Sequence, residues 1–494
     1  MLIPHGKLIA ATFREYNRMK PMLVRDGIQA SAGVALGNAL NLLNMRAKGG
    51  TTSLAAQAAS LSAIVDAVAN SGLPSTLEQD LRALESSLSA INSASLEDGE
   101  VALRYAFARF EDLVSQALAA PEAPCKAALV RMLAEWEAAD LKGQLGGEDV
   151  GEDDYRITQS SLETYLQDRF AEPSLEVTEF APLPGGFGKE TILFTVAGKA
   201  LDGEFVMRRD PGSNDSLTND CHEVFREYPV IRAAFERGFP APEVVWLDTE
   251  HSFLPGGDFI VMRKSSGRIG GDIFGAADGI PAQLAETLGD VAGKLHTLSP
   301  LRELGDHASF IADDLWDLPR AEAASRYIAT WYDYYRREVH TPSPTLCAIF
   351  AWLLDNVPQR EGRASLLHGD LGFNNMLFDD DRLTAVLDWE FAHIGDPAEE
   401  LGYIAMATGS AMDWDCFMTA YRAAGGDPVD ARDLRFYKIW AHTRNATAGN
   451  ILATRFSDGP VDDIKLTILP FIHFPHFISE AARLITEADS ADGA

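Results

Sequence analysis

One short segment of the sequence holds three polar side chains whose spacing could serve phosphate chemistry. The segment LLHGDLGFNN contains His368, Asp370 and Asn375, and Asp388 follows thirteen residues after Asn375, at the end of a short apolar run. Transfer of a phosphoryl group requires a carboxylate that orients the attacking hydroxyl and oxygen ligands that hold magnesium. We expect Asp370 to orient the hydroxyl, and Asn375 and Asp388 to face the metal.

The spacing of these residues carries more weight than any one of them. A histidine alone is usually a packed core residue, and an aspartate alone usually caps a turn or a helix. The pattern His-Gly-Asp-x4-Asn, however, has the spacing of the H-R-D-x4-N loop of protein kinases, with Gly369 in the place of arginine. Asp388 then takes the place of the kinase D-F-G aspartate, which binds magnesium. The combination therefore favours a catalytic loop.

The longer segment HGDLGFNNMLFDDDRLTAVLDWEFAHIGDP resembles the signature of the aminoglycoside phosphotransferase-like small-molecule kinases. That family includes choline and homoserine kinases and the kinase-like part of some acyl-CoA dehydrogenase proteins, and the last branch is the most similar. The resemblance covers roughly residues 156–480. It implies an α+β fold of the bilobal protein-kinase type, with a small antiparallel-sheet lobe, a large helical lobe and ATP between them. It also implies that Asn375 and Asp388 are the magnesium ligands.

The same resemblance implies roles for other residues of this segment. Asp370 is similar to the catalytic base of the family, and His368 is similar to the residue that holds the catalytic loop. Asp396, in the Gly-Asp-Pro that follows, is similar to an aspartate that supports the site. Glu390 could assist the metal indirectly.

Upstream of this loop, a glycine-rich segment could cover the phosphates of a nucleotide. The segment PLPGGFGKETILFTV contains Gly185, Gly186 and Gly188. Glycines let backbone amides approach phosphates without side-chain obstruction. The resemblance places the nucleotide-covering turn in this segment, so we expect the three glycines to contact ATP.

Two charged residues and a hinge complete the predicted nucleotide site. Arg208 stands where the kinase pattern has lysine, and its guanidinium keeps the charge but differs from an ammonium in length and geometry. Glu227 matches the glutamate that pairs with this cation, and Glu223, one turn earlier, is the competing candidate. The segment FIVMRKSSG resembles the hinge between the lobes, where main-chain groups of Met262 and Arg263 would meet adenine.

The composition is that of a globular protein that does not bind nucleic acid. The 494 residues are 46% hydrophobic and 23% charged, and the formal net charge of −31 would repel nucleic acids and anionic membranes. Four scattered cysteines without a C-x-x-C pattern indicate neither a zinc site nor a disulfide framework. The sequence shows neither a signal peptide nor a run of about eighteen apolar residues. We expect a cytoplasmic protein with no membrane or nucleic-acid partner.

Changes in sequence character divide the chain into four parts. Residues 1–141 show apolar residues at helical spacing and predict a helical bundle of unknown role, and the acidic, glycine-rich residues 142–155 predict a flexible linker. Residues 156–262 are expected to form the kinase-like N-terminal lobe. Residues 263–494 are expected to form the C-terminal lobe, with the catalytic loop and the acceptor-binding helices. The bundle could support a homodimer or bind a protein partner.

We expect a phosphotransferase that uses ATP and Mg²⁺ to phosphorylate a hydroxyl group of a small molecule. The sequence leaves the acceptor open between a hydroxyacyl-CoA, which the similarity of LDWEFAHIGDP favours, and an aminoglycoside-like polycation, which the negative charge favours. The alternative function is a nucleotide-binding pseudokinase whose helical domain docks a partner. Arg208 motivates this alternative, whereas the intact Asp370, Asn375 and Asp388 oppose it.

Overall fold

The structure is a computed structural model of the chain. It describes residues 54–71, 73–88, 91, 96–119, 126–143, 157–183, 189–210, 223–250, 254, 257–271, 279–298, 313–337, 341–458 and 473–492. These residues form two compact units. One unit holds the described parts of 1–152, 328–356 and 439–494, and the other holds the described parts of 153–327 and 357–438. The predicted catalytic residues all lie in the second of these units.

A five-stranded antiparallel sheet forms the first half of the second unit. Its strands are β1 (Glu176–Leu183), β2 (Glu190–Ala197), β3 (Gly203–Arg209), β4 (Val244–Asp248) and β5 (Phe259–Arg263). They are hydrogen-bonded in the order β1-β2-β3-β5-β4, and each neighbouring pair is antiparallel. The sheet therefore has β3 at its centre, and β3 carries Arg208 near its end.

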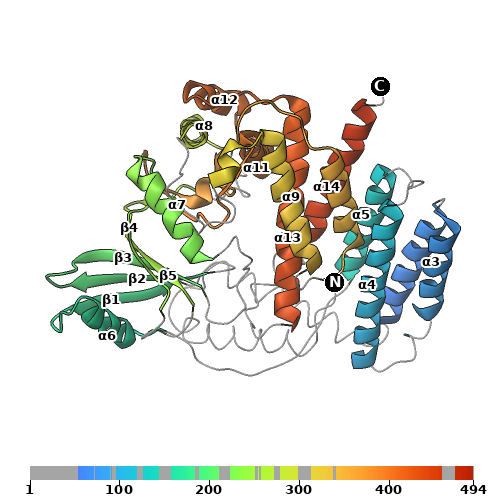
Figure 1. The fold of residues 1–494 in the computed structure, drawn as a ribbon, viewed down its shortest axis with the longest axis horizontal. Coiled ribbons are helices and arrows are strands. Elements are labelled where there is room, and N and C mark those ends of the chain that lie inside the picture. The colour runs from blue at the N-terminus through green and yellow to red at the C-terminus, as the bar shows by residue number, and fades with distance from the viewer. Residues whose placement is uncertain are drawn as a thin grey trace. The chain divides into compact units, whose positions relative to one another are not determined.

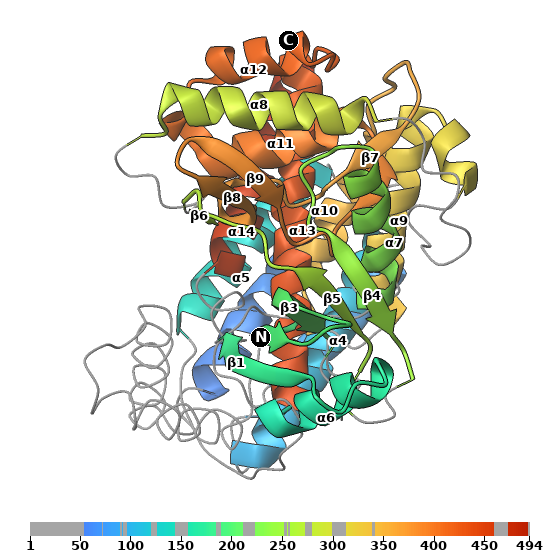
Figure 2. The same ribbon diagram turned by 90° about the vertical axis from the view of Figure 1, so that its left-hand side faces the viewer.

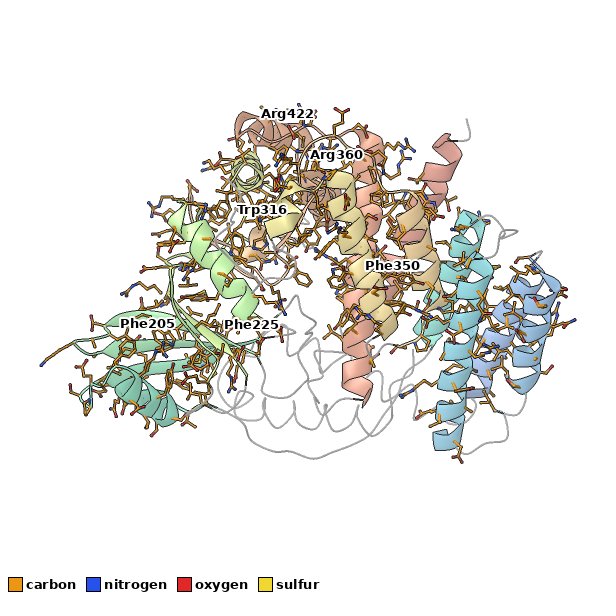
Figure 3. The ribbon with its side chains drawn as sticks, viewed as in Figure 1. Phe205, Phe225, Trp316, Phe350, Arg360 and Arg422 are labelled. Atoms are coloured by element: carbon orange, nitrogen blue, oxygen red, sulfur yellow. The ribbon has the colours of Figure 1, made fainter. Side chains whose placement is uncertain are left out.

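The two faces of this sheet are covered by different helices, α6 (Gln159–Arg169) and α7 (Val224–Glu236), as Figure 1 shows. Successive side chains of a strand point to opposite faces. Phe205, labelled in Figure 3, belongs with Met207 to the core that contains the buried residues of α6. Val206 packs instead with the buried residues of α7. The alternation therefore directs the next even-numbered side chain, Arg208, to the α7 face.

Helices dominate the second half of the same unit. Its elements are β6 (Arg268–Ile269), α8 (Ala282–His296), η3 (Asp313–Asp317), β7 (Ser365–Leu367), η4 (Phe373–Asn375), β8 (Met376–Asp379), β9 (Arg382–Val386), β10 (His393–Gly395), α11 (Pro397–Thr408), η5 (Gly409–Ala411) and α12 (Trp414–Ala423). Helices α8 and α12 lie side by side in Figure 2. They approach closely because Gly289 has no side chain, and a Cβ there would lie 2.3 Å from the carbonyl oxygen of Phe417.

Short strands set the two ends of the predicted catalytic loop. β7 pairs with β10 and ends one residue before His368, whereas β8 begins one residue after Asn375. β8 and β9 form a hairpin in which Met376 lies opposite Val386. Because β9 ends two residues before Asp388, the hairpin returns the chain from Asn375 to Asp388.

The regular elements among the described residues of the first unit are all helices. It contains the helical residues 54–69, and α3 (Ser75–Leu88), α4 (Leu96–Ala119), α5 (Lys126–Gly143), α10 (Pro344–Asp355) and α14 (Phe474–Asp492), and it shares α9 (Arg320–Arg337) and α13 (Ala431–Asp458) with the other unit. Helix α5 packs against α14, and α10 packs against α4 and α5. In its core Phe350, labelled in Figure 3, lies against Trp440 and Tyr332.

The prediction of a small antiparallel sheet followed by a large helical part is confirmed. The N-terminal helices pack with C-terminal ones in a single unit, a relationship that helical periodicity does not reveal. Of the predicted linker 142–155, residues 142 and 143 end α5 and the others lie outside the described residues. No helix in the described part of the chain is long and apolar enough to cross a membrane.

Candidate active site

The predicted catalytic loop is held at its first residue by the buried side chain of His368. The Nε2 atom of His368 lies 2.9 Å from the carbonyl oxygen of Leu387, to which it donates a hydrogen bond. The other ring nitrogen, Nδ1, then accepts from the backbone amide of Asp370 at 3.3 Å. The imidazole therefore ties the loop to the residue that precedes Asp388.

The backbone conformation of Gly369 explains why glycine occupies the position that arginine has in the kinase H-R-D pattern. Its φ is +80°, in the region that favours glycine. A Cβ on this residue would lie 2.4 Å from the carbonyl oxygen of Phe391, which is closer than real contacts allow. Neither arginine nor alanine could adopt this geometry without a shift of the loop.

The buried carboxylate of Glu400, on α11, binds two backbone amides at the start of the catalytic loop. It accepts hydrogen bonds from the backbone amides of His368 at 2.9 Å and Gly369 at 2.8 Å. Its Oε2 atom, which accepts from His368, also lies 3.4 Å from Nε2 of His296, whose Nδ1 lies 3.0 Å from the hydroxyl of Tyr421. Burial alone would raise the pKa of Glu400, but the hydrogen bond and charge of His296, with the backbone hydrogen bond from His368, lower it to about 2. A charged carboxylate therefore fixes the start of the loop.

Both carboxylate oxygens of Asp370 accept hydrogen bonds from neighbouring side chains. The amide nitrogen of Asn375 donates to Oδ2 at 2.9 Å and to the backbone oxygen of Asp370 at 2.9 Å. The hydroxyl of Tyr403, on α11, donates to Oδ1. This arrangement fixes the direction of the carboxylate and turns the amide oxygen of Asn375 away from Asp370.

Asp388 lies beside this loop in a strained backbone conformation. The backbone oxygen of Asn375 accepts from the amide of Leu387 at 2.7 Å, which brings the two candidate metal ligands onto adjacent segments. The φ of Asp388 is +65°, and such values are rare outside glycine and cluster at functional sites. A carboxylate and an amide oxygen are donors that suit Mg²⁺, which keeps further positions for phosphates and water. The residues present therefore fit a magnesium ion held by Asn375 and Asp388.

Arg208 connects the sheet to this segment through three carboxylates. Its Nη2 atom pairs with Asp388 and lies 3.0 Å from Oε2 of Glu390, and its Nε atom lies 3.4 Å from Oε2 of Glu227. The competing candidate, Glu223, precedes α7 and pairs with Arg226 instead. The structure therefore brings Glu227, and not Glu223, to Arg208.

Burial and mutual charge shift the pKa values of this cluster. Burial and the charge of Asp388 raise the pKa of Glu390 to about 8, although Arg208 opposes the shift. Burial also raises the pKa of Glu227 against the attraction of Arg208. For Arg208, burial lowers the pKa, but the charges of Asp388, Glu227 and Glu390 outweigh it, so the pKa lies above its ordinary value. Arg208 is therefore permanently charged, whereas Glu390 can change its charge near neutral pH.

Residues 179–440 match the phosphotransferase enzyme family, APH. The chain belongs to this family. The match begins within β1 and includes the rest of the sheet, the predicted catalytic loop and the carboxylate cluster. It confirms both the family resemblance and the prediction of an enzyme that transfers a phosphoryl group.

Known relatives of the chain carry the same region within longer proteins. The chain is 31% identical over 260 residues to acyl-CoA dehydrogenase family member 11 of Gallus gallus, a match that covers 50% of this chain and 31% of that protein. It is 26% identical over 280 residues to the Homo sapiens protein of the same name, with 53% and 33% covered. The chain thus spans about a third of the length of these relatives.

Solved structures of phosphotransferases are similar to the chain at lower sequence identity. One is a thermostable mutant of aminoglycoside phosphotransferase APH(4)-Ia in ternary complex with ADP and hygromycin B. It is 18% identical, and the match covers 66% of this chain and 98% of that one with a TM-score of 0.41. Because this TM-score lies below 0.5, the family assignment depends on the sequence match alone.

Three buried side chains that contact the predicted site residues were not predicted from the sequence. Glu400 and Tyr403 lie on α11, about thirty residues beyond the loop, and no spacing rule singles them out. Lys189 is buried next to Asp210, and its position directly after the glycine-rich segment was the only signal in the sequence. Their contacts depend on the fold and not on local sequence.

The remaining predicted nucleotide contacts are only partly described. Gly185, Gly186 and Gly188 lie outside the described residues. Met262 and Arg263 end β5, where the amide of Arg263 donates to the carbonyl of Glu243 at 2.9 Å. That amide is already used within the sheet, so the contact of this hinge with adenine stays a prediction.

Asp396 acts at the base of α11 and not in the loop itself. It precedes the helix as its N-cap, and its carboxylate accepts from the amide of Ala398 at 3.0 Å. It also pairs with Arg360, labelled in Figure 3, at 2.8 Å, and accepts from the hydroxyl of Tyr437 at 3.1 Å. These contacts fix the start of the helix that carries Glu400 and Tyr403, which is a supporting role.

Proposed function

We propose that the chain transfers the γ-phosphoryl group of ATP to a hydroxyl group of a small molecule. The observation that carries this proposal is the carboxylate of Asp370, fixed by Asn375 and Tyr403 beside the segment of Asp388. Phosphoryl transfer asks the protein mainly for positioning and for stabilisation of charge. A fixed carboxylate next to two oxygen donors supports this chemistry.

Each residue of the site has a role in this proposal. Asp370 orients the acceptor hydroxyl and receives its proton, and His368 holds the loop that carries Asp370. Asn375 and Asp388 hold Mg²⁺, which neutralises the phosphates when it is bound. Arg208 binds the phosphates, and Glu227 positions Arg208 from α7.

The ion pair of Arg208 with Asp388 places a cation beside the proposed magnesium site. Glu227 lies 3.4 Å from the Nε side of the guanidinium and would orient it towards the phosphates of a bound nucleotide. Arginine in the place of lysine thus keeps a cation at the site, which speaks against the pseudokinase alternative.

For the acceptor, we propose a hydroxylated acyl-CoA ahead of an aminoglycoside. The relatives that share about half of this chain are named acyl-CoA dehydrogenase family members, which supports an acyl-CoA ligand. The aminoglycoside alternative is supported by the acidic composition, since a polycation would be attracted to it.

A panel of acceptors tests the function and separates these classes. ADP release is measured with Mg-ATP and either hydroxyacyl-CoAs of several chain lengths or kanamycin and hygromycin B. The proposal expects ADP release that depends on a hydroxyacyl-CoA and is absent with the matching acyl-CoA that lacks the hydroxyl. Release only with the aminoglycosides would reassign the acceptor, and nucleotide binding without transfer to any alcohol would support the pseudokinase alternative.

A further inference from the structure

Lys189 is a buried lysine next to the predicted nucleotide site. It immediately precedes β2, and only 4% of its side chain is exposed. Its Nζ atom lies 2.5 Å from Oδ1 of Asp210 and 3.8 Å from Oε1 of Glu227. Lysines are almost never buried without a partner, so this ammonium is held in place by two carboxylates.

Glu227 lies between two cations that come from adjacent strands. Arg208 on β3 approaches one of its oxygens at 3.4 Å, and Lys189 approaches the other at 3.8 Å. Both are ion pairs without a hydrogen bond, because neither oxygen of Glu227 accepts one from the described residues. The glutamate on α7 thus orients two cations and not one.

The single positive charge of Arg208 would not be enough to neutralise the negative charges of a bound triphosphate. That charge faces Glu227, Asp388 and Glu390. Lys189, in contrast, can turn away from Asp210 and still leave that carboxylate with a hydrogen-bond partner. The other oxygen of Asp210 accepts from the amide of Val224 at 3.1 Å. Lys189 therefore has a charge that it can present to a ligand.

We infer that Lys189 is a second phosphate-binding cation of the nucleotide site, and that Glu227 positions it together with Arg208. This inference rests on the proposed use of ATP.

Affinities for ATP and adenosine separate phosphate binding from a structural role of Lys189. Dissociation constants are measured by calorimetry for the full chain and for Lys189→Met, Lys189→Arg and Lys199→Met, the last being an exposed lysine beyond the other end of β2. Loss of a charged contact predicts a Kd for ATP that rises about tenfold or more in Lys189→Met. Adenosine affinity should stay unchanged, Lys189→Arg should retain most of the ATP affinity, and Lys199→Met should bind like the unaltered chain.

Two results would overturn the inference. One is ATP affinity in Lys189→Met equal to that of the unaltered chain, and the other is an equal loss of ATP and adenosine affinity, which would indicate a structural role. If Lys189→Met does not fold, the double variant Lys189→Met/Asp210→Asn removes both charges of the buried pair and is judged by the same two comparisons. An unaltered chain that binds no ATP at all would contradict the proposed function itself, and the inference with it.

Discussion

Tyr403 donates a hydrogen bond to Asp370 Oδ1, while Asn375 donates to Oδ2 of the same carboxylate. An ionised carboxylate offers about four lone-pair positions, so these two donors leave room for an acceptor hydroxyl. They also prevent the carboxylate from rotating. The direction of the proposed base is therefore set by α11, a helix well beyond the loop in the sequence.

The variant Tyr403→Phe tests this relationship with the loss of a single hydroxyl. Because one hydrogen bond to a charged group is removed, we expect kcat to fall about tenfold with little change in KM for ATP. Tyr105→Phe, at an exposed tyrosine, is the matched control. An unchanged kcat would mean that Tyr403 only packs.

Gly369→Ala tests whether the loop needs glycine for its space as well as its conformation. Gly238→Ala is the matched control, because Gly238 has a φ of +78° but a Cβ there meets nothing within 4 Å. We expect the control to lose about 1 kcal/mol of unfolding free energy from backbone strain alone. Gly369→Ala should lose more and should also lower kcat strongly, since a shift away from Phe391 displaces Asp370. Chemical denaturation and steady-state kinetics measure both, and equal behaviour of the two variants would refute the steric argument.

Glu400→Gln tests the carboxylate that binds the two loop amides. A glutamine side chain keeps one acceptor oxygen but places an NH₂ group against a backbone donor. We expect a loss of about 2 kcal/mol of stability and a lower kcat, because an amide of the loop loses its partner. Glu286→Gln, at an exposed position of α8, should change neither. If Glu400→Gln unfolds at the same denaturant concentration as the unaltered chain, the carboxylate does not hold the loop.

The raised pKa of Glu390 leads us to expect that the stability of the folded chain depends on pH. Its pKa is raised to about 8 in the folded chain from an ordinary value of 4.5. Between these values the unfolded chain has released the proton and the folded chain has not, so the folded state loses stability as pH rises from 4.5 to 8. Glu390→Gln should flatten this decline by on the order of 1 kcal/mol, measured by denaturation at pH 5, 6, 7 and 8 without metal. Parallel curves for the two proteins would contradict the raised pKa.

The sequence predicted those parts of the fold and the site that depend on local spacing. The strand within GEFVMRRDP is such a local feature, and it occurs as β3. The sequence did not identify the partner of Arg208, because Glu223 and Glu227 are one helical turn apart. Only the packing in the structure shows that Glu227 pairs with Arg208 and Glu223 with Arg226. Glu400 and Tyr403 lie on α11 and reach the loop only in the folded chain. No sequence pattern within the loop identifies them.

The most direct test of the account is the rate of phosphoryl transfer by Asp370→Asn. The substitution keeps the shape of the side chain but removes the carboxylate that orients the hydroxyl and receives its proton. With an acceptor found in the panel and γ-labelled ATP, we expect transfer of label to fall about a thousandfold while the Kd for ATP stays unchanged. Transfer by Asp370→Asn at the rate of the unaltered chain would contradict the assignment of Asp370 and the site built around it.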